Sequence, residues 1–300
     1  MPFFSVVIPT YNRAGFIKDT VRSVFDQSFK DVEILIIDDG STDQTEDVVK
    51  TLAKDSLEIR YFKTQNQERG AARNYGLKQA KGKYVVFLDS DDKLKNEALL
   101  TLEKAIISNQ YPEYIAGKFE LISSKGQRIN TSISKVKEGI KSYRDFLKGN
   151  ILACNFAVKR ENPTLKPFQE DRSYSGMEDW IFLVENLRQS KMVLIDNYLI
   201  EMNDHEDRSM ANNQLMIDKK LTASDWIIKN VDLSSSEKKI LNGYASYFCA
   251  IHAYLEGKRK MAFAHLGNAV KKVGIKAKFV VLFIKISLGY RWTQRLKRSK

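Results

Sequence analysis

An unbroken apolar run at residues 84–88 (YVVFL) most strongly limits what this 300-residue chain can fold into. Its apolar and polar residues do not alternate, so the run predicts a strand buried on both faces of a parallel sheet. The run ends at the acidic residues 89–92 (DSDD). Open α/β sheets bind ligands at the carboxyl ends of such strands, but small polar residues also form solvated turns before helices. This stretch alone leaves both interpretations open.

The first 90 residues alternate between strand and helix patterns. Strands are predicted at residues 5–8, 32–37, 57–62 and 84–88, and helices at 14–27 and 69–80. Short connections between such elements are typical of a doubly wound parallel sheet. Polar side chains follow three of these strands, namely Thr10 and Asn12, then Asp38 and Asp39, then the acidic stretch 89–92. Their alignment at one sheet edge favours a ligand site.

Two common phosphate-binding loops are missing from the sequence. Neither G-x-G-x-x-G after the first strand nor G-x-x-x-x-G-K-[ST] occurs. A bound diphosphate would therefore need a divalent cation held by carboxylates, and Mg²⁺ or Mn²⁺ prefers such oxygen ligands.

Four segments carry a family resemblance, in this order: SVVIPTYNRAGFIKDTVRSVFDQSF, VEILIIDDGSTDQTEDVV, ERGAARNYGLKQAKGKYVVFLDSDD and GMEDWIF. Over roughly the first 210 residues the chain resembles the family 2 glycosyltransferases of the GT-A fold. The resemblance implies an α/β nucleotide-diphospho-sugar transferase fold, with a mostly parallel sheet flanked by helices. It also implies transfer of a sugar from a nucleotide-diphosphate donor with inversion at the anomeric carbon.

The resemblance also implies roles for residues near the nucleotide. It places Pro9, Thr10 and Asn12 around the base and ribose, and Asp39 on the uracil or ribose. Asp38 is expected to be structural.

The segment Asp89-Ser90-Asp91 matches the DxD motif of the family. The resemblance implies a donor contact for Asp89 and Ser90 and metal ligation by Asp91. It places Arg73 beside the diphosphate, although a surface helix arginine is the plain alternative. His205 is a candidate second metal ligand, and its alternative is a solvated surface histidine.

Glu178 and Asp179 match the ED motif of the family at the start of an apolar helix. The helix dipole alone would explain two carboxylates there. The resemblance instead implies that Asp179 is the general base, with Glu178 as its partner. A single base fits direct displacement and inversion.

The expected organisation is a GT-A domain over residues 1–212, followed by a helical extension. Residues 1–110 would form the nucleotide-binding half and residues 111–212 the acceptor half, with a polar loop at 203–209. Helices are predicted at 215–229, 236–255 and 258–273, separated by Gly257 and Gly274.

The basic charge is concentrated at the carboxyl end. Residues 257–300 contain thirteen of the 49 lysines and arginines and none of the 37 acidic residues. Within them, residues 277–300 form a basic amphipathic tail, which predicts contact with an anionic membrane surface. The alternative is that the apolar part packs on the protein body. Without a recognisable binding module, no nucleic-acid partner is expected.

The amino terminus has no signal-peptide pattern, and Cys154 and Cys249 have no metal-ligand spacing. We therefore expect a cytoplasmic protein, peripheral at the inner face of the membrane. The expected function is a Mn²⁺- or Mg²⁺-dependent inverting glycosyltransferase of cell-surface polysaccharide synthesis. The donor is expected to be a UDP-sugar, with GDP and dTDP open, and the acceptor a saccharide or lipid-linked saccharide. An inactive peripheral membrane protein and a nucleotidyltransferase are the alternatives.

Overall fold

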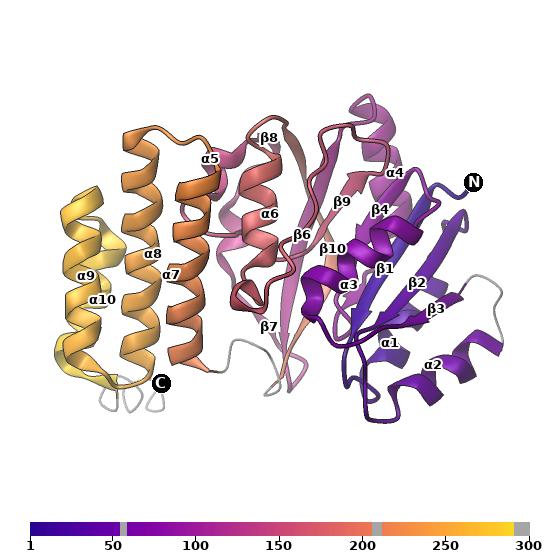
Figure 1. Cartoon of the computed structure of the whole chain (residues 1–300), viewed down its shortest axis with the longest axis horizontal. Coiled ribbons are helices and arrows are strands. Elements are labelled where there is room, and N and C mark those ends of the chain that lie inside the picture. The colour runs from indigo at the N-terminus through magenta and orange to yellow at the C-terminus, as the bar shows by residue number, and fades with distance from the viewer. Residues whose placement is uncertain (55–58, 206–211, 291–300) are drawn as a thin grey trace. The chain divides into compact units, whose positions relative to one another are not determined.

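The computed structural model describes residues 1–54, 59–205 and 212–290, and the chain divides into two compact units. The first unit comprises Met1–Tyr143 and Ile151–Glu206, and it contains the sheet (Figure 1). The second unit comprises Arg144–Asn150 and Asp207–Lys300 and is helical. The domain boundary after residue 212 stays a prediction.

Within the described residues, ten strands form one sheet in the order β3-β2-β1-β4-β9-β6-β10-β5, with β7 beside β6 and β8 beside β10. Strands β3, β2, β1 and β4 are parallel, whereas β9 is antiparallel to both β4 and β6. The strands are β1 (Phe4–Thr10), β2 (Val32–Asp38), β3 (Ile59–Lys63), β4 (Tyr84–Phe87), β5 (Lys93–Leu94), β6 (Tyr114–Ser123), β7 (Arg128–Ile129), β8 (Gly139–Lys141), β9 (Phe156–Lys159) and β10 (Met192–Asp204).

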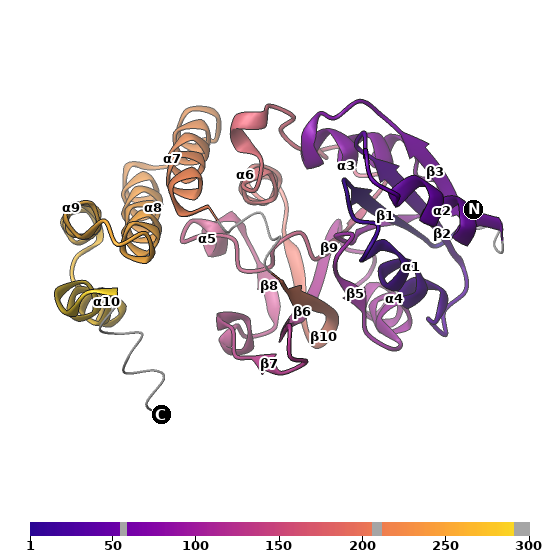
Figure 2. The same ribbon diagram turned by 90° about the horizontal axis from the view of Figure 1, so that it is seen from below.

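Helices cover both faces of this sheet (Figure 2). On one face, Ile17, Val21 and Val24 of α1 recur at helical spacing and join a buried apolar cluster with side chains of α2 and α4. On the other face lie α3 and α6, and Gly76 of α3 lies directly against Val7 of β1. The helices of this unit are α1 (Ile17–Phe25), α2 (Thr45–Lys54), α3 (Glu68–Gln79), α4 (Ala98–Ser108) and α6 (Glu178–Asn186), and α5 (Tyr143–Phe146) begins at its boundary with the second unit.

The first strand is longer than the sequence predicts, because it continues through Pro9 to Thr10. Val7 is the last residue of β1 that pairs with β4, and its carbonyl accepts a hydrogen bond from Leu88. The backbone nitrogen of Pro9 points to the same side as that of Val7, toward β4. Strand β4 ends at Phe87, before it reaches Pro9. The missing N–H of Pro9 therefore costs no ladder bond there.

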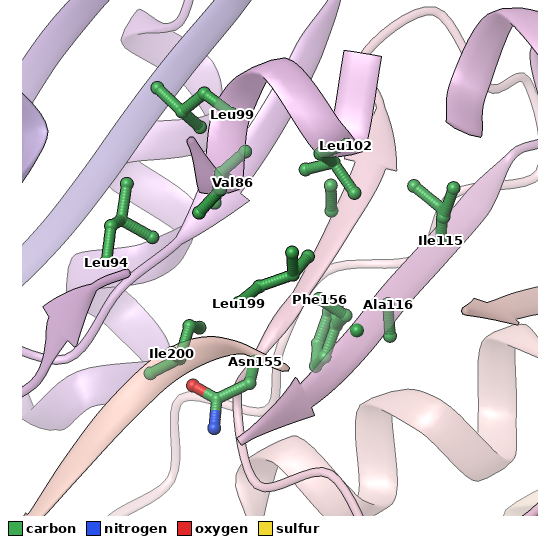
Figure 3. Close-up of a pocket in the computed structure, with 13 residues that line it drawn as sticks. Val86, Leu94, Leu99, Leu102, Ile115, Ala116, Asn155, Phe156, Leu199 and Ile200 are labelled. Atoms are coloured by element: carbon green, nitrogen blue, oxygen red, sulfur yellow. The ribbon is translucent and has the colours of Figure 1, made fainter. Parts of the chain in front are cut away.

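A small cavity lies between α4 and the sheet, lined by Leu102, Ile115, Phe156, Leu199 and other apolar side chains (Figure 3). Its volume is about 20 Å³, which is room for about one water molecule. A nucleotide sugar cannot fit there. The cavity is a packing feature of the apolar core.

Besides most of α5, the second unit contains four helices within its described residues: α7 (Asn213–Asn230), α8 (Ser235–Leu255), α9 (Arg259–Val273) and α10 (Ala277–Leu288). A capping box between Ser234 and Glu237 begins α8. Gly257 and Gly274 separate the helices as predicted, with φ values of 74° and 72° that favour glycine. No helix of the described residues is long and apolar enough to cross a membrane.

Candidate active site

The three strands that end in polar residues are neighbours in the sheet. Strand β1 pairs in parallel with β2 on one side and with β4 on the other. Their carboxyl ends therefore share one edge, as the sequence predicts. Pro9 and Thr10 are buried within the end of β1, and the Thr10 hydroxyl has no partner among the described residues.

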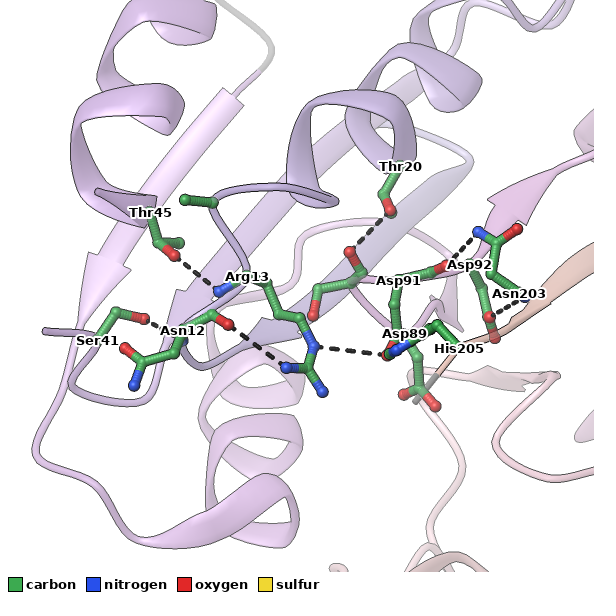
Figure 4. Close-up of polar contacts among 12 residues, drawn as sticks. Asn12, Arg13, Thr20, Ser41, Thr45, Asp89, Asp91, Asp92, Asn203 and His205 are labelled. Carbon is green, nitrogen blue, oxygen red and sulfur yellow. Dashed lines mark hydrogen bonds and ion pairs between the residues drawn. The ribbon is translucent and has the colours of Figure 1, made fainter. Parts of the chain in front are cut away.

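Asn12 organises the loop that follows β2 (Figure 4). Its side-chain oxygen accepts from the backbone N–H of Thr42 at 2.9 Å, and its own N–H donates to the Ser41 hydroxyl at 2.9 Å. Asn12 has a φ of 50°, in the left-handed region that asparagine tolerates better than most residues. Here Asn12 connects the ends of β1 and β2.

The two aspartates after β2 have different partners. Asp38 accepts from the Ser41 N–H at 2.7 Å and from the Tyr61 hydroxyl at 2.5 Å, which is a structural arrangement. Asp39 accepts from the N–H groups of Gln67 and Glu68, at 2.7 and 2.8 Å, where α3 begins. Burial raises the pKa of Asp39, although these two amides partly offset the shift. Asp39 thus fixes the start of α3 beside the strand ends.

Asp91 lies next to His205, although 114 residues separate them in the chain (Figure 4). The Asp91 Oδ2 and His205 Nε2 atoms are 3.0 Å apart. The His205 ring stacks on Phe16 with 4.5 Å between centroids, and its side chain is 13% exposed. A solvated surface histidine is therefore the wrong alternative.

Strand pairing explains this meeting. Residues 93–94 form β5, which pairs antiparallel with β10 at Ile200 and Glu201. The end of β10 therefore lies beside the acidic loop, where Asn203 donates to the backbone oxygen of Asp91 and to the side chain of Asp92. The predicted loop at 203–209 is wrong at its start. Pairing with β6 extends β10 to Asp204, and 206–211 lie outside the described residues.

Arg13 lies at the candidate site, and sequence reasoning did not single it out. Its Nε lies 3.5 Å from the Asp91 Oδ2 atom, and its guanidinium lies over the Phe16 ring. The only signal in the sequence is a basic residue directly after Asn12 in the loop at the end of β1. Arg13 places a positive charge beside the acidic loop.

Arg73 connects the two acidic motifs. Its NH2 group donates to Asp89 at 2.7 Å, and its NH1 group donates to Glu178 at 2.6 Å. The Arg73 side chain is 1% exposed, so the alternative of a surface helix arginine is wrong. Its Nε is buried without a partner among the described residues. One buried guanidinium thus fixes the position of Asp89 relative to the start of α6.

The segment before α6 packs tightly on α3. Asn74 donates to the Phe168 carbonyl at 2.9 Å and accepts from the Phe168 N–H at 2.8 Å. A β-carbon on Gly70 would lie 2.1 Å from the Gln169 carbonyl oxygen, so only glycine permits this approach. Ser175 donates to Glu68 at 2.7 Å. These contacts explain why the motif segment at 70–74 is rich in small and polar residues.

Glu178 and Asp179 have opposite electrostatic properties. Burial alone would raise the pKa of Glu178, but the charges of Arg73 and Arg69 and its hydrogen bonds lower it. Burial and the negative charge of Glu178 together raise the pKa of Asp179 to about 6. Asp179 accepts from the Trp180 N–H at 2.6 Å and is partly exposed. Two adjacent carboxylates with separated pKa values are typical of an acid–base site.

The resemblance to glycosyltransferases predicts a sugar-transfer reaction whose rate depends on pH through Asp179. If Asp179 is the base, only its ionised form is active, so we expect a plateau at neutral pH. Below a pH of about 6 the rate should fall about tenfold per pH unit, because the pKa of Asp179 is raised to about 6. The measurement is kcat as a function of pH with saturating donor and acceptor. A plateau extending down to pH 4 would contradict this assignment.

Asp91 and His205 together supply a carboxylate oxygen and an imidazole nitrogen. Within the described residues, no group of three or more His, Cys, Asp or Glu side chains is arranged to hold a metal ion. A cation here would need further oxygen ligands from a diphosphate and water, which is how Mg²⁺ and Mn²⁺ are commonly bound. The donor set therefore fits a cation shared with a phosphate-containing ligand.

The fold and this site define a GT-A glycosyltransferase. The sequence model described as Glycosyl transferase family 2 matches residues 5–161. The chain is 31% identical to the GalNAc(5)-diNAcBac-PP-undecaprenol beta-1,3-glucosyltransferase of Campylobacter jejuni, covering 100% of this chain and 98% of the relative. It is 32% identical to the putative teichuronic acid biosynthesis glycosyltransferase TuaG of Bacillus subtilis, covering 61% and 73%. The chain belongs to glycosyl transferase family 2.

Solved structures support the same fold. S. aureus TarS 1–349 in complex with UDP-GlcNAc aligns with a TM-score of 0.65 at 22% identity, over 94% of this chain and 84% of that one. The mannosyltransferase PcManGT of Pyrobaculum calidifontis, in complex with GDP-Man and Mn²⁺, aligns with a TM-score of 0.60 at 17% identity, over 98% and 82%. The predicted GT-A fold is confirmed.

Proposed function

We propose that this glycosyltransferase moves a sugar from a nucleotide-diphosphate donor, with UDP-sugars as the first choice, and inverts the anomeric carbon. The observation that carries the proposal is the buried bridge from Asp89 through Arg73 to Glu178, beside a carboxylate of raised pKa at Asp179. The bridge joins the predicted donor motif to the predicted base. Membership of glycosyl transferase family 2 removes the nucleotidyltransferase alternative.

In this proposal Asp179 removes the proton from the acceptor hydroxyl. A pKa of about 6 leaves Asp179 ionised at neutral pH yet basic enough to accept that proton. Glu178 is already paired with Arg73, so it orients the start of α6 rather than attacking the sugar. With one base and no covalent intermediate, the acceptor displaces the nucleotide directly and the anomeric carbon inverts.

The donor is proposed to lie over the carboxyl ends of β1, β2 and β4. There Thr10, Asn12 and Asp39 line the nucleotide side, while Asp89 and Ser90 border the ribose and diphosphate. Asp91 and His205 would hold Mn²⁺ or Mg²⁺. The cation would neutralise the diphosphate, which gains charge as the leaving group.

Metal-dependent donor binding tests the role of Asp91. We expect Asp91→Ala to lose the gain in nucleotide affinity that Mn²⁺ provides, by more than about tenfold, because a carboxylate ligand is removed. The measurement is calorimetry with and without Mn²⁺. Asp19→Ala is the matched control, because Asp19 is 59% exposed on α1 and pairs with Lys93. An unchanged metal-dependent gain in Asp91→Ala would remove Asp91 from the metal site.

The experiment that tests the function as a whole is calorimetry of UDP-, GDP- and dTDP-linked sugars, with Mn²⁺ and with a chelator. Metal-dependent binding of one donor, followed by transfer to an acceptor, supports the proposal and identifies the nucleotide. A folded sample that binds no donor would favour the inactive membrane-binding alternative.

The acceptor is proposed to be a saccharide or a lipid-linked saccharide of cell-surface polysaccharide synthesis. The support is that the Campylobacter jejuni relative is named for an undecaprenol-linked acceptor and the Bacillus subtilis relative for teichuronic acid biosynthesis. A lipid-linked acceptor would be met at a membrane surface. We therefore propose a cytoplasmic enzyme that is peripheral at the inner face of the membrane, with residues 277–300 as the contact.

A further inference from the structure

Helix α10 (Ala277–Leu288) is apolar almost all the way around. Only Lys278, Lys285 and Ser287 are polar among its twelve residues. A helix with this composition is normally buried on every side. An apolar surface of α10 that the neighbouring helices leave exposed would therefore need a binding partner.

Among the described residues of its unit, only one side of α10 is covered. Phe279, Leu282 and Ile286 are 1%, 5% and 0% exposed and belong to the cluster shared with α8 and α9 (Figures 1 and 2). The sequence alternative in which this stretch packs on the protein is therefore correct for these three residues. It does not account for the rest of the helix.

The remaining large apolar side chains of α10 are exposed to between 45% and 53%. With Ile275, which is 73% exposed, they form a surface that we call the α10 face: Ile275, Val280, Val281, Phe283, Ile284 and Leu288. The described residues include fifteen large exposed apolar side chains, and six of these belong to the α10 face. Single exposed apolar residues are ordinary, but five on one short helix and a sixth just before it mark a binding surface.

The charges around the α10 face indicate what binds there. The helix pair α9 and α10 and the residues beside it carry exposed basic side chains, among them Lys260, Lys271, Lys272, Lys276 and Lys285. The sequence from residue 257 onward contains no aspartate or glutamate. A second copy of this face would bring like charges together. An anionic lipid surface instead offers phosphates to the lysines and an apolar layer to the side chains.

We infer that the α10 face inserts into the headgroup region of an anionic bilayer, with α10 lying along the surface. The inference deepens the proposed function, because it names the residues that would bring the enzyme to a lipid-linked acceptor. Membrane binding itself does not depend on which sugar is transferred. Residues 291–300 of the predicted tail lie outside the described residues.

Point substitutions test this better than a deletion. Removing residues 277–300 would also remove Phe279, Leu282 and Ile286 and open the cluster that they share with α8 and α9. The double variant Val281→Ser and Ile284→Ser changes only exposed side chains. Ile140→Ser is the matched control, because Ile140 is 63% exposed on β8 in the other unit.

The measurement is co-sedimentation of the full chain with phosphatidylcholine vesicles, with and without phosphatidylglycerol. We expect the wild type and Ile140→Ser to bind only the anionic vesicles, and binding should weaken as salt rises. The Val281→Ser and Ile284→Ser double variant should bind about tenfold or more weakly. Lys272→Glu combined with Lys285→Glu should weaken binding by a comparable factor.

Three results would overturn the inference. The first is vesicle binding by the double serine variant equal to that of the wild type. The second is equal binding to neutral and anionic vesicles at every salt concentration. The third is a wild type that binds no vesicles but forms a dimer in light scattering that the serine variant loses, which would assign the face to a second copy. Donor calorimetry on the same variants should be unchanged, so failure here is separable from failure of the proposed function.

Discussion

Asp179→Asn is expected to lower the turnover of sugar transfer by about 10²- to 10⁴-fold while donor binding stays intact. The substitution keeps the oxygen that accepts from the Trp180 N–H, so the start of α6 retains its local geometry. It removes only the ability to take up a proton. The measurement is single-turnover transfer with saturating donor, alongside donor affinity from calorimetry.

Folding stability provides the control for Asp179→Asn. Because the pKa of Asp179 is raised in the folded protein, its charge opposes folding above that pKa. The variant should therefore be at least as stable as the wild type at pH 8, and this advantage should vanish as pH falls toward the ordinary value of 3.8. Glu185→Gln, the third carboxylate of α6, is the matched control for turnover. Near wild-type turnover in Asp179→Asn would show that another group is the base.

Arg73→Met is expected to lower the free energy of unfolding by about 3–5 kcal/mol, because it leaves carboxylates without their buried partner. The side chain of Glu178 is 3% exposed, so water cannot replace the guanidinium there. Asp89 is 24% exposed and should recover part of its solvation. The measurement is urea denaturation at pH 7, and turnover should fall as well because Glu178 and the start of α6 lose their fixed position.

Two further variants separate charge from packing at Arg73. Adding Glu178→Gln to Arg73→Met removes the buried charge, so the double variant should be more stable than Arg73→Met alone. Lys63→Met breaks an exposed ion pair with Glu46 and should leave stability nearly unchanged. If Arg73→Met unfolds at the same urea concentration as the wild type, the bridge has no structural role.

The alternation of strands and helices was predictable because local pattern controls it. Buried runs such as residues 84–88 and helical spacing such as Ile17, Val21 and Val24 depend on neighbours along the chain. Predicted ends differed by a few residues. The largest error was at β10, where a polar sequence that looks like a loop is extended by hydrogen bonding to β6.

The candidate site was predicted in part, because local pattern also determines where the strands end. Parallel strands bring their carboxyl ends together, so the meeting of Thr10, Asp39 and Asp89 at one edge followed from pattern alone. The roles of these residues in donor binding stay predictions. Local pattern does not distinguish Arg13 or Arg73 from a surface arginine, because their partners lie far away in the chain, and only the family resemblance singled out Arg73.

Sequence alone was sufficient for the GT-A fold, the family, the edge of the sheet that carries the acidic motifs and the basic character of the last helices. Contacts across 105 and 114 residues, from Arg73 to Glu178 and from Asp91 to His205, needed the folded chain. So did the division of α10 into a buried side and an exposed apolar side. Periodicity records which residues are apolar, whereas burial and pairing depend on what the rest of the chain brings beside them.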